Sequence, residues 1–272
     1  METKTRICTI KDLNDKSIFF IVLKDKNVAN FKILNSSLEN YILSSIDYDY
    51  EILETGKDIA IKDLKPYLDR ADILFVVNVS TPLISETTID SIIEYFLAKE
   101  CKAVKLPIGF VFDTNYLKNN KNISFDATYM QNEADFLEVS DEISRQKAER
   151  ILEQRIIDYH KSCGVTFESD NVYIEPTVDI AKGVVISSNV KLMGETSLGY
   201  NCMIKENSII SNSVLSDKCS ISNSVIDNSK IGSNTVVMPY CFIQNTMVGD
   251  NVLVKSNKRI ENIIIANNKT IE

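Results

Sequence analysis

The stretch VVISSNVKLMGETSLGYNCMIKENSII, residues 184–210, decides the fold of the C-terminal part of this chain. Within it an aliphatic residue returns at a fixed interval of six positions. A period of six fits neither the 3.6-residue turn of a helix nor the two-residue pleat of an ordinary strand. It is three pleats long, so each aliphatic side chain leaves a short extended segment on the same side. Hexapeptide repeats of this kind are typical of a parallel β-helix. The aliphatic residues of this stretch are Ile186, Leu192, Leu198, Ile204 and Ile210.

The same spacing, in steps of six or five residues, continues from Ile174 to Ile271. About eighteen residues make one triangular coil, so the segment predicts about five to six stacked coils, roughly 25 Å tall. Coils of this class wind left-handed, which is a property of the class rather than of the spacing. The residue four positions after each aliphatic is also expected to face the core, and to be small or β-branched. These residues are Val178, Val184, Val190, Thr196, Cys202, Ser208, Val214, Cys219, Val225, Thr235, Cys241, Val252 and Ile264. The exceptions are Lys230, Met247, Lys258 and Lys269.

Length and composition set further limits. The chain has 272 residues, enough for two domains, and a net charge of −8 with a pI near 4.9. No basic stripe is visible, so nucleic acid is excluded as an expected partner. No stretch resembles a signal peptide, and the longest apolar run, Ile18–Leu23, is too short to span a membrane. The six cysteines form no CxxC pair, and those in inward slots of the repeat are interpreted as core packing. We expect a cytoplasmic chain.

The first half alternates predicted strands and helices. This alternation favours an α/β layer fold with a mostly parallel sheet, whose ligand site is expected at the carboxyl ends of the strands. The predicted strands are Ser17–Leu23, Tyr48–Leu53, Ala71–Val79 and Ile108–Phe112, and the predicted helices are Ser37–Ser45 and Glu86–Lys99. Residues 142–162 have a helical apolar face and are followed by Gly164, a typical helix end. His160, the only histidine, is expected to be a surface group near that end.

Several motifs carry a resemblance to a known family. The chain resembles the bifunctional enzymes that join an N-acetylglucosamine-1-phosphate uridylyltransferase domain to a glucosamine-1-phosphate acetyltransferase β-helix. The resemblance is specific from about residue 136 onward and weaker over Asp72–Ile84. The stretches that carry it are Arg145–Ile156, Gly164–Phe167, Tyr173–Pro176, Asn234–Tyr240 and Val248–Val252.

The resemblance implies an α/β nucleotidyltransferase-like (Rossmann-like) N-terminal domain over residues 1–141, shorter than in the family. A linker helix over residues 142–163 and a left-handed parallel β-helix of hexapeptide repeats over residues 164–272 are expected to follow. It further implies a homotrimer formed through the β-helix and a sugar nucleotide such as UDP-N-acetylglucosamine as ligand. The short apolar runs predict no membrane partner.

The chain departs from the family where the nucleotidyl transfer would occur. The family's Gly-rich loop, whose backbone N–H groups approach phosphates, is replaced after the first strand by a segment without glycine that contains Lys24 and Lys26. The family's metal-binding Asp aligns with Ser80, and its second metal ligand, an Asn, aligns with Ser140. Serine is a poor sole ligand for Mg²⁺, which prefers carboxylate and phosphate oxygens.

The acetyltransferase part departs from the family as well. No histidine follows His160, so the histidine that the family uses as a base is missing from the sequence. The family's sugar-phosphate-binding Arg aligns near Gln244 and its Lys near Glu261, which replaces two cations by an amide and an acid.

We therefore predict a relative of these enzymes in which both catalytic sites are eroded, with no catalytic and no metal-binding residue. It would bind a sugar nucleotide, or regulate an active family member by entering its trimers. The candidate ligand-binding residues are Lys24, Lys26, Ser80, Thr81, Pro82, Ser140 and Asp141.

Three alternatives stay open. The first is an active sugar-1-phosphate nucleotidyltransferase with a rebuilt site, and only this reading requires Mg²⁺ as a cofactor. It would draw on the carboxylates of Asp25, Asp72, Asp113 and Asp141. The second is a hexapeptide-repeat acyltransferase with an acceptor that the sequence does not reveal. The third is a purely structural scaffold.

Overall fold

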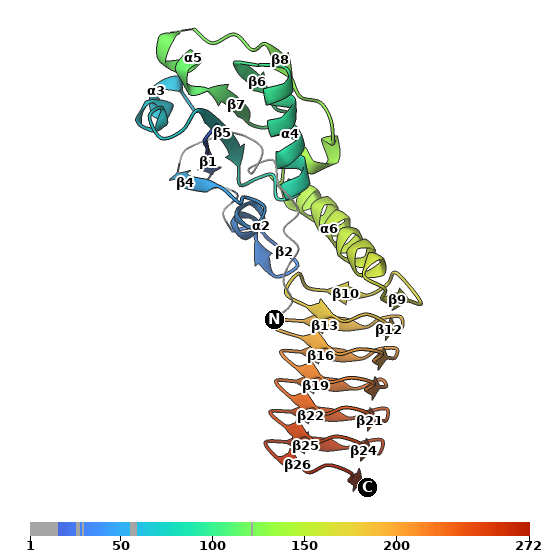
Figure 1. The fold of residues 1–272 in the computed structure, drawn as a ribbon. Helices are drawn as coiled ribbons and strands as arrows, with labels where there is room; N and C mark the ends of the chain where they lie inside the picture. Colours follow the sequence, from blue (N-terminus) through green and yellow to red (C-terminus); the bar gives the residue numbers. More distant parts are fainter. Residues whose placement is uncertain (1–15, 26–27, 29, 55–58, 121) are drawn as a thin grey trace. The chain divides into compact units, whose positions relative to one another are not determined.

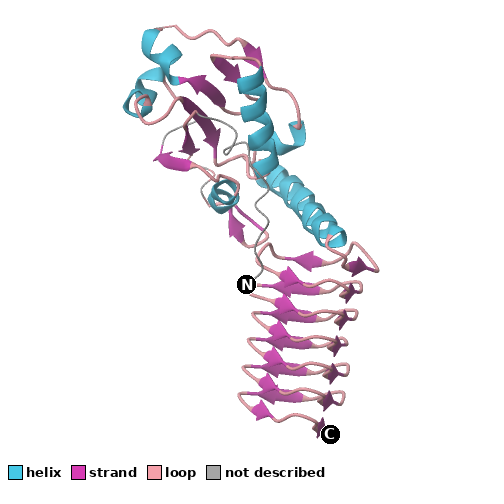
Figure 2. Ribbon diagram, in the orientation of Figure 1, coloured by secondary structure: helices cyan, strands magenta, loops and turns pink. Residues whose placement is uncertain are grey.

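The structure is a computed structural model that describes residues 16–25, 28, 30–54, 59–120 and 122–272. The chain forms two compact units, residues 1–149 and 150–272 (Figure 1). The first unit mixes helices and strands, and the second is built almost entirely of short strands after the end of one long helix (Figure 2). In the part of the chain that the structure describes, every helix is too short or too polar to cross a bilayer.

A six-stranded sheet with the order β4-β1-β5-β7-β6-β8 forms the centre of the first unit. All of its strands run in one direction except β7, which is antiparallel to both of its neighbours. The mostly parallel α/β fold that the sequence predicts is therefore confirmed. The strands are β1 (Ile18–Lys24), β4 (Asp49–Glu54), β5 (Ile73–Asn78), β6 (Ala103–Lys105), β7 (Phe110–Asp113) and β8 (Ala127–Thr128).

The two faces of β1 are packed by different side chains. Phe19, Ile21 and Leu23 lie in a core with Tyr67 and Leu74. Phe20, on the opposite face, stacks on Phe75 with ring centroids 4.6 Å apart. A strand buried on both faces reads as a continuous apolar run, which is why the sequence identified β1 correctly.

Short helices and one hairpin complete this unit. Helix α2 begins after Ser37, whose side chain accepts a hydrogen bond from the Asn40 amide, and α4 begins after Ser85 in the same way. The helices are α2 (Leu38–Ser44), α3 (Ile61–Leu64), α4 (Glu86–Ala98) and α5 (Thr114–Asn119). The 3₁₀ turns are η1 (Lys65–Tyr67) and η2 (Glu133–Phe136), and the hairpin strands are β2 (Lys32–Ile33) and β3 (Ser36–Ser37).

Helix α6 (Glu142–Ser162) is the predicted linker helix. It ends at Ser162, and Gly164 follows with a φ of +89°. The prediction that His160 is a surface group is wrong: its side chain is only 6% exposed, and its Nδ1 has no hydrogen-bond partner. His160 is buried while Tyr159 and Lys161 beside it are exposed. One turn earlier Ile156 packs against the core of the β-helix, and the Val165 N–H donates to the carbonyl of His160.

Three parallel sheets, stacked coil on coil, form the second unit, and the hexapeptide left-handed β-helix is confirmed. The first sheet contains β10 (Tyr173–Ile174), β13 (Lys191–Met193), β16 (Ile209–Ser211), β19 (Val225–Asp227), β22 (Phe242–Gln244) and β25 (Arg259–Glu261). The second contains β11 (Asp179–Ile180), β14 (Ser197–Leu198), β17 (Val214–Leu215), β20 (Lys230–Ile231), β23 (Met247–Val248) and β26 (Ile264–Ile265). The third contains β9 (Thr166–Phe167), β12 (Val185–Ile186), β15 (Met203–Ile204), β18 (Ser220–Ile221), β21 (Val236–Val237), β24 (Leu253–Val254) and β27 (Thr270–Ile271).

The aliphatic residues of the repeat form one continuous core, and the inward cysteines are buried in it as free thiols. The rule that the fourth residue after each aliphatic faces the core fails at the five-residue steps. There Val214 is 42% and Ile264 79% exposed, and Val225 is half-buried. The shorter step moves the inward slot to the third residue, and a hydroxyl side chain fills it at every five-residue step but the last. These buried residues are Ser213, Ser224, Ser229 and Thr246.

Candidate functional site

The carboxyl ends of β1 and β5 lie side by side and form the edge of the sheet where a ligand is expected. The Val79 amide donates to the carbonyl of Leu23 at 2.9 Å. The chain then turns sharply after β5, because the Ser80 amide donates to Oδ1 of Asn78 at 2.9 Å. The predicted site residues Ser80, Thr81 and Pro82 lie in this turn.

All three of these residues are buried. The Thr81 hydroxyl donates to the carbonyl of Asn78 at 2.7 Å. The Ser80 side chain is only 2% exposed, and its Oγ has no hydrogen-bond partner. A buried hydroxyl without a partner costs free energy, so a ligand or a water at the strand ends would stabilise this atom.

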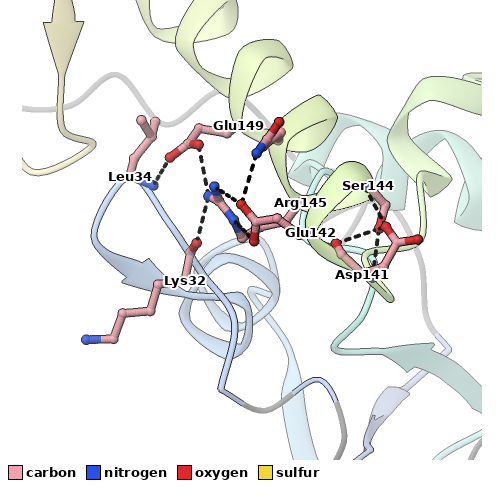
Figure 3. A network of polar contacts seen from close by, with 8 residues as sticks. Lys32, Leu34, Asp141, Glu142, Ser144, Arg145 and Glu149 are labelled. Atoms are coloured by element: carbon pink, nitrogen blue, oxygen red, sulfur yellow. Dashed lines mark hydrogen bonds and ion pairs between the residues drawn. The ribbon is translucent and has the colours of Figure 1, made fainter.

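The second predicted segment lies directly beside the first. The Val139 amide donates to the carbonyl of Ser80 at 2.7 Å, so the structure brings Ser80 and Ser140 into neighbouring backbone segments. Ser140 itself is exposed, as is Asp141. The Asp141 carboxylate accepts from the Ser144 amide at 2.7 Å at the start of α6 (Figure 3). Hydrogen bonds from Ser144 lower the pKa of Asp141, so this carboxylate is already used as a helix cap.

Of the two predicted lysines, only Lys24 can be placed. Its Nζ lies 2.5 Å from a carboxylate oxygen of Glu39, which raises the pKa of Lys24 by hydrogen bonding and charge. The cation that the sequence offers to a phosphate is thus paired within the protein. Lys26 lies outside the described residues.

A network of polar contacts on α6, which the sequence analysis missed, binds the turn between β2 and β3 (Figure 3). Arg145 donates to Glu149 at 2.9 Å and to the carbonyl of Lys32 at 3.3 Å, and it also binds Glu142. Glu149 accepts from the Leu34 amide at 3.3 Å. Leu34 has a φ of +44°, unusual for a branched residue, so these bonds hold a strained turn between β2 and β3. The spacing of Glu142, Arg145 and Glu149 on a helix was the available signal.

The four carboxylates of the alternative nucleotidyltransferase reading do not all lie at one end of the sheet. Asp72 lies before β5 and accepts from the amide and hydroxyl of Ser17, hydrogen bonds that lower its pKa. Asp113 is paired in register with Ile73, so both acids lie at the end of the sheet opposite to Ser80. Asp25 is buried after β1. Asp72 and Asp113 therefore cannot join a site at the strand ends near Ser80.

The residues at the strand ends do not fit a Mg²⁺ ion. The two positions that the resemblance assigns to metal ligands carry hydroxyl groups, one of them buried. Among the described residues, no group of three or more His, Cys, Asp or Glu side chains could hold a metal ion. Since Mg²⁺ prefers carboxylate and phosphate oxygens, we derive no step through a bound metal.

In the β-helix, the two positions that the resemblance assigns to phosphate-binding cations are stacked on adjacent coils, Gln244 beside Glu261. Gln244 donates to Asp227 at 2.9 Å, and together with Ser211 it lowers the pKa of Asp227. Glu261 forms an ion pair of 2.5 Å with Arg259. Both positions are therefore occupied by groups that bind their neighbours and attract no phosphate.

Comparison with known proteins supports this family. A family model described as the GMPPB C-terminal domain matches residues 168–272. The bifunctional protein GlmU of Lactobacillus johnsonii is 39% identical over 75 residues, which are 27% of this chain and 16% of that protein. GlmU of Clostridioides difficile is 32% identical over 103 residues, which are 38% of this chain and 22% of that protein. The resemblance to GlmU is confirmed. The matched region spans about a fifth of the length of these GlmU proteins.

Two solved structures show a more distant likeness. A mutant of perosamine N-acetyltransferase from Caulobacter crescentus, in complex with CoA and GDP-perosamine, has a TM-score of 0.37 at 11% identity. The likeness covers 94% of this chain and 95% of that one. A 4-diphosphocytidyl-2C-methyl-D-erythritol synthase from Anaerococcus prevotii has a TM-score of 0.40 at 8% identity and covers 52% of this chain and 100% of that one. At these values neither structure bears on the chemistry of this chain.

Proposed function

We propose that this chain is a non-catalytic, GlmU-like protein. Its N-terminal unit binds a sugar nucleotide such as UDP-N-acetylglucosamine at the strand ends without transferring a nucleotidyl group. Its β-helix forms a trimer, either with copies of itself or with subunits of an active relative.

The observation that carries the proposal is the state of Ser80. The resemblance puts a metal-binding carboxylate at this position, and the chain has instead a buried hydroxyl without a partner. Phosphoryl transfer needs a cation that neutralises charge on the attacking and leaving oxygens. A site with hydroxyls at both ligand positions and Lys24 already paired is poorly equipped for that task, but it can still donate hydrogen bonds to a sugar or a phosphate.

The trimer is supported by the outer faces of the β-helix. Apolar side chains are exposed on the second sheet, at Val214, Met247 and Ile264, and on the third, at Met203 and Val236. Lys230 interrupts the apolar positions on the second sheet and Ser220 those on the third. Exposed apolar side chains that gather on flat sheets favour a surface that another chain covers. If light scattering gave the mass of a single chain, it would contradict both the trimer and the assembly with an active relative.

The main experiment separates binding from turnover. The chain is titrated with UDP-N-acetylglucosamine in a calorimeter, first with EDTA and then with Mg²⁺. It is also incubated with UTP, N-acetylglucosamine-1-phosphate and Mg²⁺ while pyrophosphate is measured. We expect binding that Mg²⁺ does not strengthen, and no pyrophosphate. Pyrophosphate release would contradict the proposal and favour the rebuilt nucleotidyltransferase. Absence of binding would contradict the assignment of a sugar nucleotide as the ligand.

A further inference from the structure

Strand β4 has one open edge. All six of its residues pair with β1, and no other strand in the described part of the chain pairs with it (Figure 1). Its outer N–H and C=O groups are therefore oriented to accept another strand. Strand addition of this kind takes its affinity from main-chain hydrogen bonds and its specificity from the side chains on the two faces.

A hollow of about 540 Å³ adjoins the first half of this edge. It is lined by Phe19, Tyr48, Asp49, Tyr50 and Arg70. Three of these are aromatic, and Tyr50 is exposed. A hollow lined by aromatic rings together with the charged groups of Asp49 and Arg70 can receive a side chain of an inserted strand.

The cation in the hollow is held in place and neutralised. The Arg70 guanidinium lies over the rings of Phe19 and Tyr67, at 5.1 and 5.3 Å from their centroids. It also binds Glu51 at 2.8 Å, and the Tyr67 hydroxyl donates to the same carboxylate at 2.8 Å. Glu51 is thus neutralised, and the remaining acids of β4 are Asp49 and Glu54, of which Glu54 lies opposite Lys24 of β1.

These two acids decide which kind of strand can pair here. Asp49 and Glu54 are exposed, one at each end of β4, and they point to opposite faces because they are five residues apart. An incoming strand with basic side chains at the two matching positions would therefore gain one favourable charge pair on each face.

We propose that the open edge of β4 binds an extended segment of a partner protein. The segment has a basic residue at each end, five positions apart, and apolar or β-branched residues between them. The basic residues pair with Asp49 and Glu54, and an apolar side chain enters the hollow beside Tyr50. The inserted segment becomes the seventh strand of the sheet.

The probe is a fluorescein-labelled peptide that contains Arg-Ile-Thr-Val-Ile-Lys, and its anisotropy is measured with the full chain. We expect saturable binding that Asp49→Lys with Glu54→Lys weakens about tenfold or more, because two attractive pairs become repulsive. A peptide with Glu in place of both basic residues should bind that double variant better than the unsubstituted chain. The matched control, Glu195→Lys with Glu206→Lys, makes the same change in net charge on the β-helix and should leave binding unchanged.

A control variant separates the partner from the chain itself. Residues 6–11, Arg-Ile-Cys-Thr-Ile-Lys, have the same charge pattern in sequence. Binding of the probe to an Arg6→Glu/Lys11→Glu chain, but not to the unsubstituted chain, would contradict a partner protein as the source of the strand. It would assign the edge to residues 6–11 of the chain itself. Binding to neither chain, or equal weakening by the Glu195/Glu206 control, would overturn the proposal.

Discussion

The backbone N–H of Ser229 donates a hydrogen bond to the buried hydroxyl of Ser213, one coil away, at 3.0 Å. The arrangement repeats in the next coil, where the Thr246 N–H donates to the Ser229 hydroxyl at 3.1 Å. Each hydroxyl in turn donates to the carbonyl two residues before it, as Ser229 does to Asp227 at 2.7 Å. The hydroxyls therefore satisfy backbone groups that the shortened corners leave inside the core.

Replacing Ser229 by alanine should leave the Thr246 N–H buried without an acceptor. We expect the free energy of unfolding to fall by about 1–3 kcal/mol, the usual cost of an unsatisfied buried donor. Amide exchange at Thr246 should accelerate, as measured by NMR. Ser229→Thr should be tolerated, because Thr246 occupies the same slot of the next coil. Ser216→Ala, at a partly exposed corner, is the control. Equal effects of the two alanine variants would show that the hydroxyl column contributes no stability.

Ser80 should show the opposite behaviour. Its hydroxyl is buried without a partner, so Ser80→Ala should stabilise the ligand-free chain, by up to about 1 kcal/mol. The same variant should weaken UDP-N-acetylglucosamine binding if this hydroxyl donates to the ligand. Ser80→Asp would bury a carboxylate without a partner, and should destabilise by about 3–5 kcal/mol. Urea unfolding and calorimetry measure the two effects. If Ser80→Ala destabilised the ligand-free chain, the hydroxyl would have a partner in solution.

The sequence predicted the β-helix and the buried strands because their patterns are long and regular. It failed where one residue changes the register. At a five-residue step the aliphatic spacing still looks correct, but the second inward slot moves from Val214 to Ser213. Such a shift is visible only if the Asn-Ser or Asn-Thr pairs are read as corners, with Asn in the left-handed conformation, as Asn212 is with a φ of +48°.

The candidate site shows a different limit. The resemblance placed Ser80 and Ser140 in one site, and the hydrogen bond from Val139 to Ser80 brings their segments together. The sequence could not show that Ser80 is buried, or that Lys24 is paired with Glu39. Both depend on side chains from distant parts of the chain, and no local spacing encodes them. Buried His160 was missed for the same reason.

The network on α6 predicts a local effect on the turn between β2 and β3. Glu149→Ala removes the charged acceptor of the Leu34 amide, a bond worth about 1.5 kcal/mol or more. We expect the exchange of this amide to rise about tenfold. Arg145→Lys keeps the charge but cannot bind Glu142, Glu149 and the Lys32 carbonyl together, so an intermediate effect is expected. Glu133→Ala, an exposed acid outside the network, should change nothing. Unchanged exchange in Glu149→Ala would mean that the turn holds itself.

His160 should make stability depend on pH in mildly acidic solution. Burial lowers the pKa of His160 below its ordinary value of 6.5, and the nearby charge of Asp179 opposes this only in part. Above pH 6.5 the imidazole is neutral in both the folded and the unfolded chain, so it adds no pH dependence. As the pH falls below 6.5, the unfolded chain takes up the proton first, so the free energy of unfolding decreases until the folded chain is protonated as well. His160→Phe keeps a ring in the core but cannot take up a proton. The difference in unfolding free energy between the two chains, measured in urea from pH 8 to pH 5, should be constant above 6.5 and move in favour of the variant below it. A constant difference over the whole range would show that His160 is as accessible to protons in the folded chain as in the unfolded one.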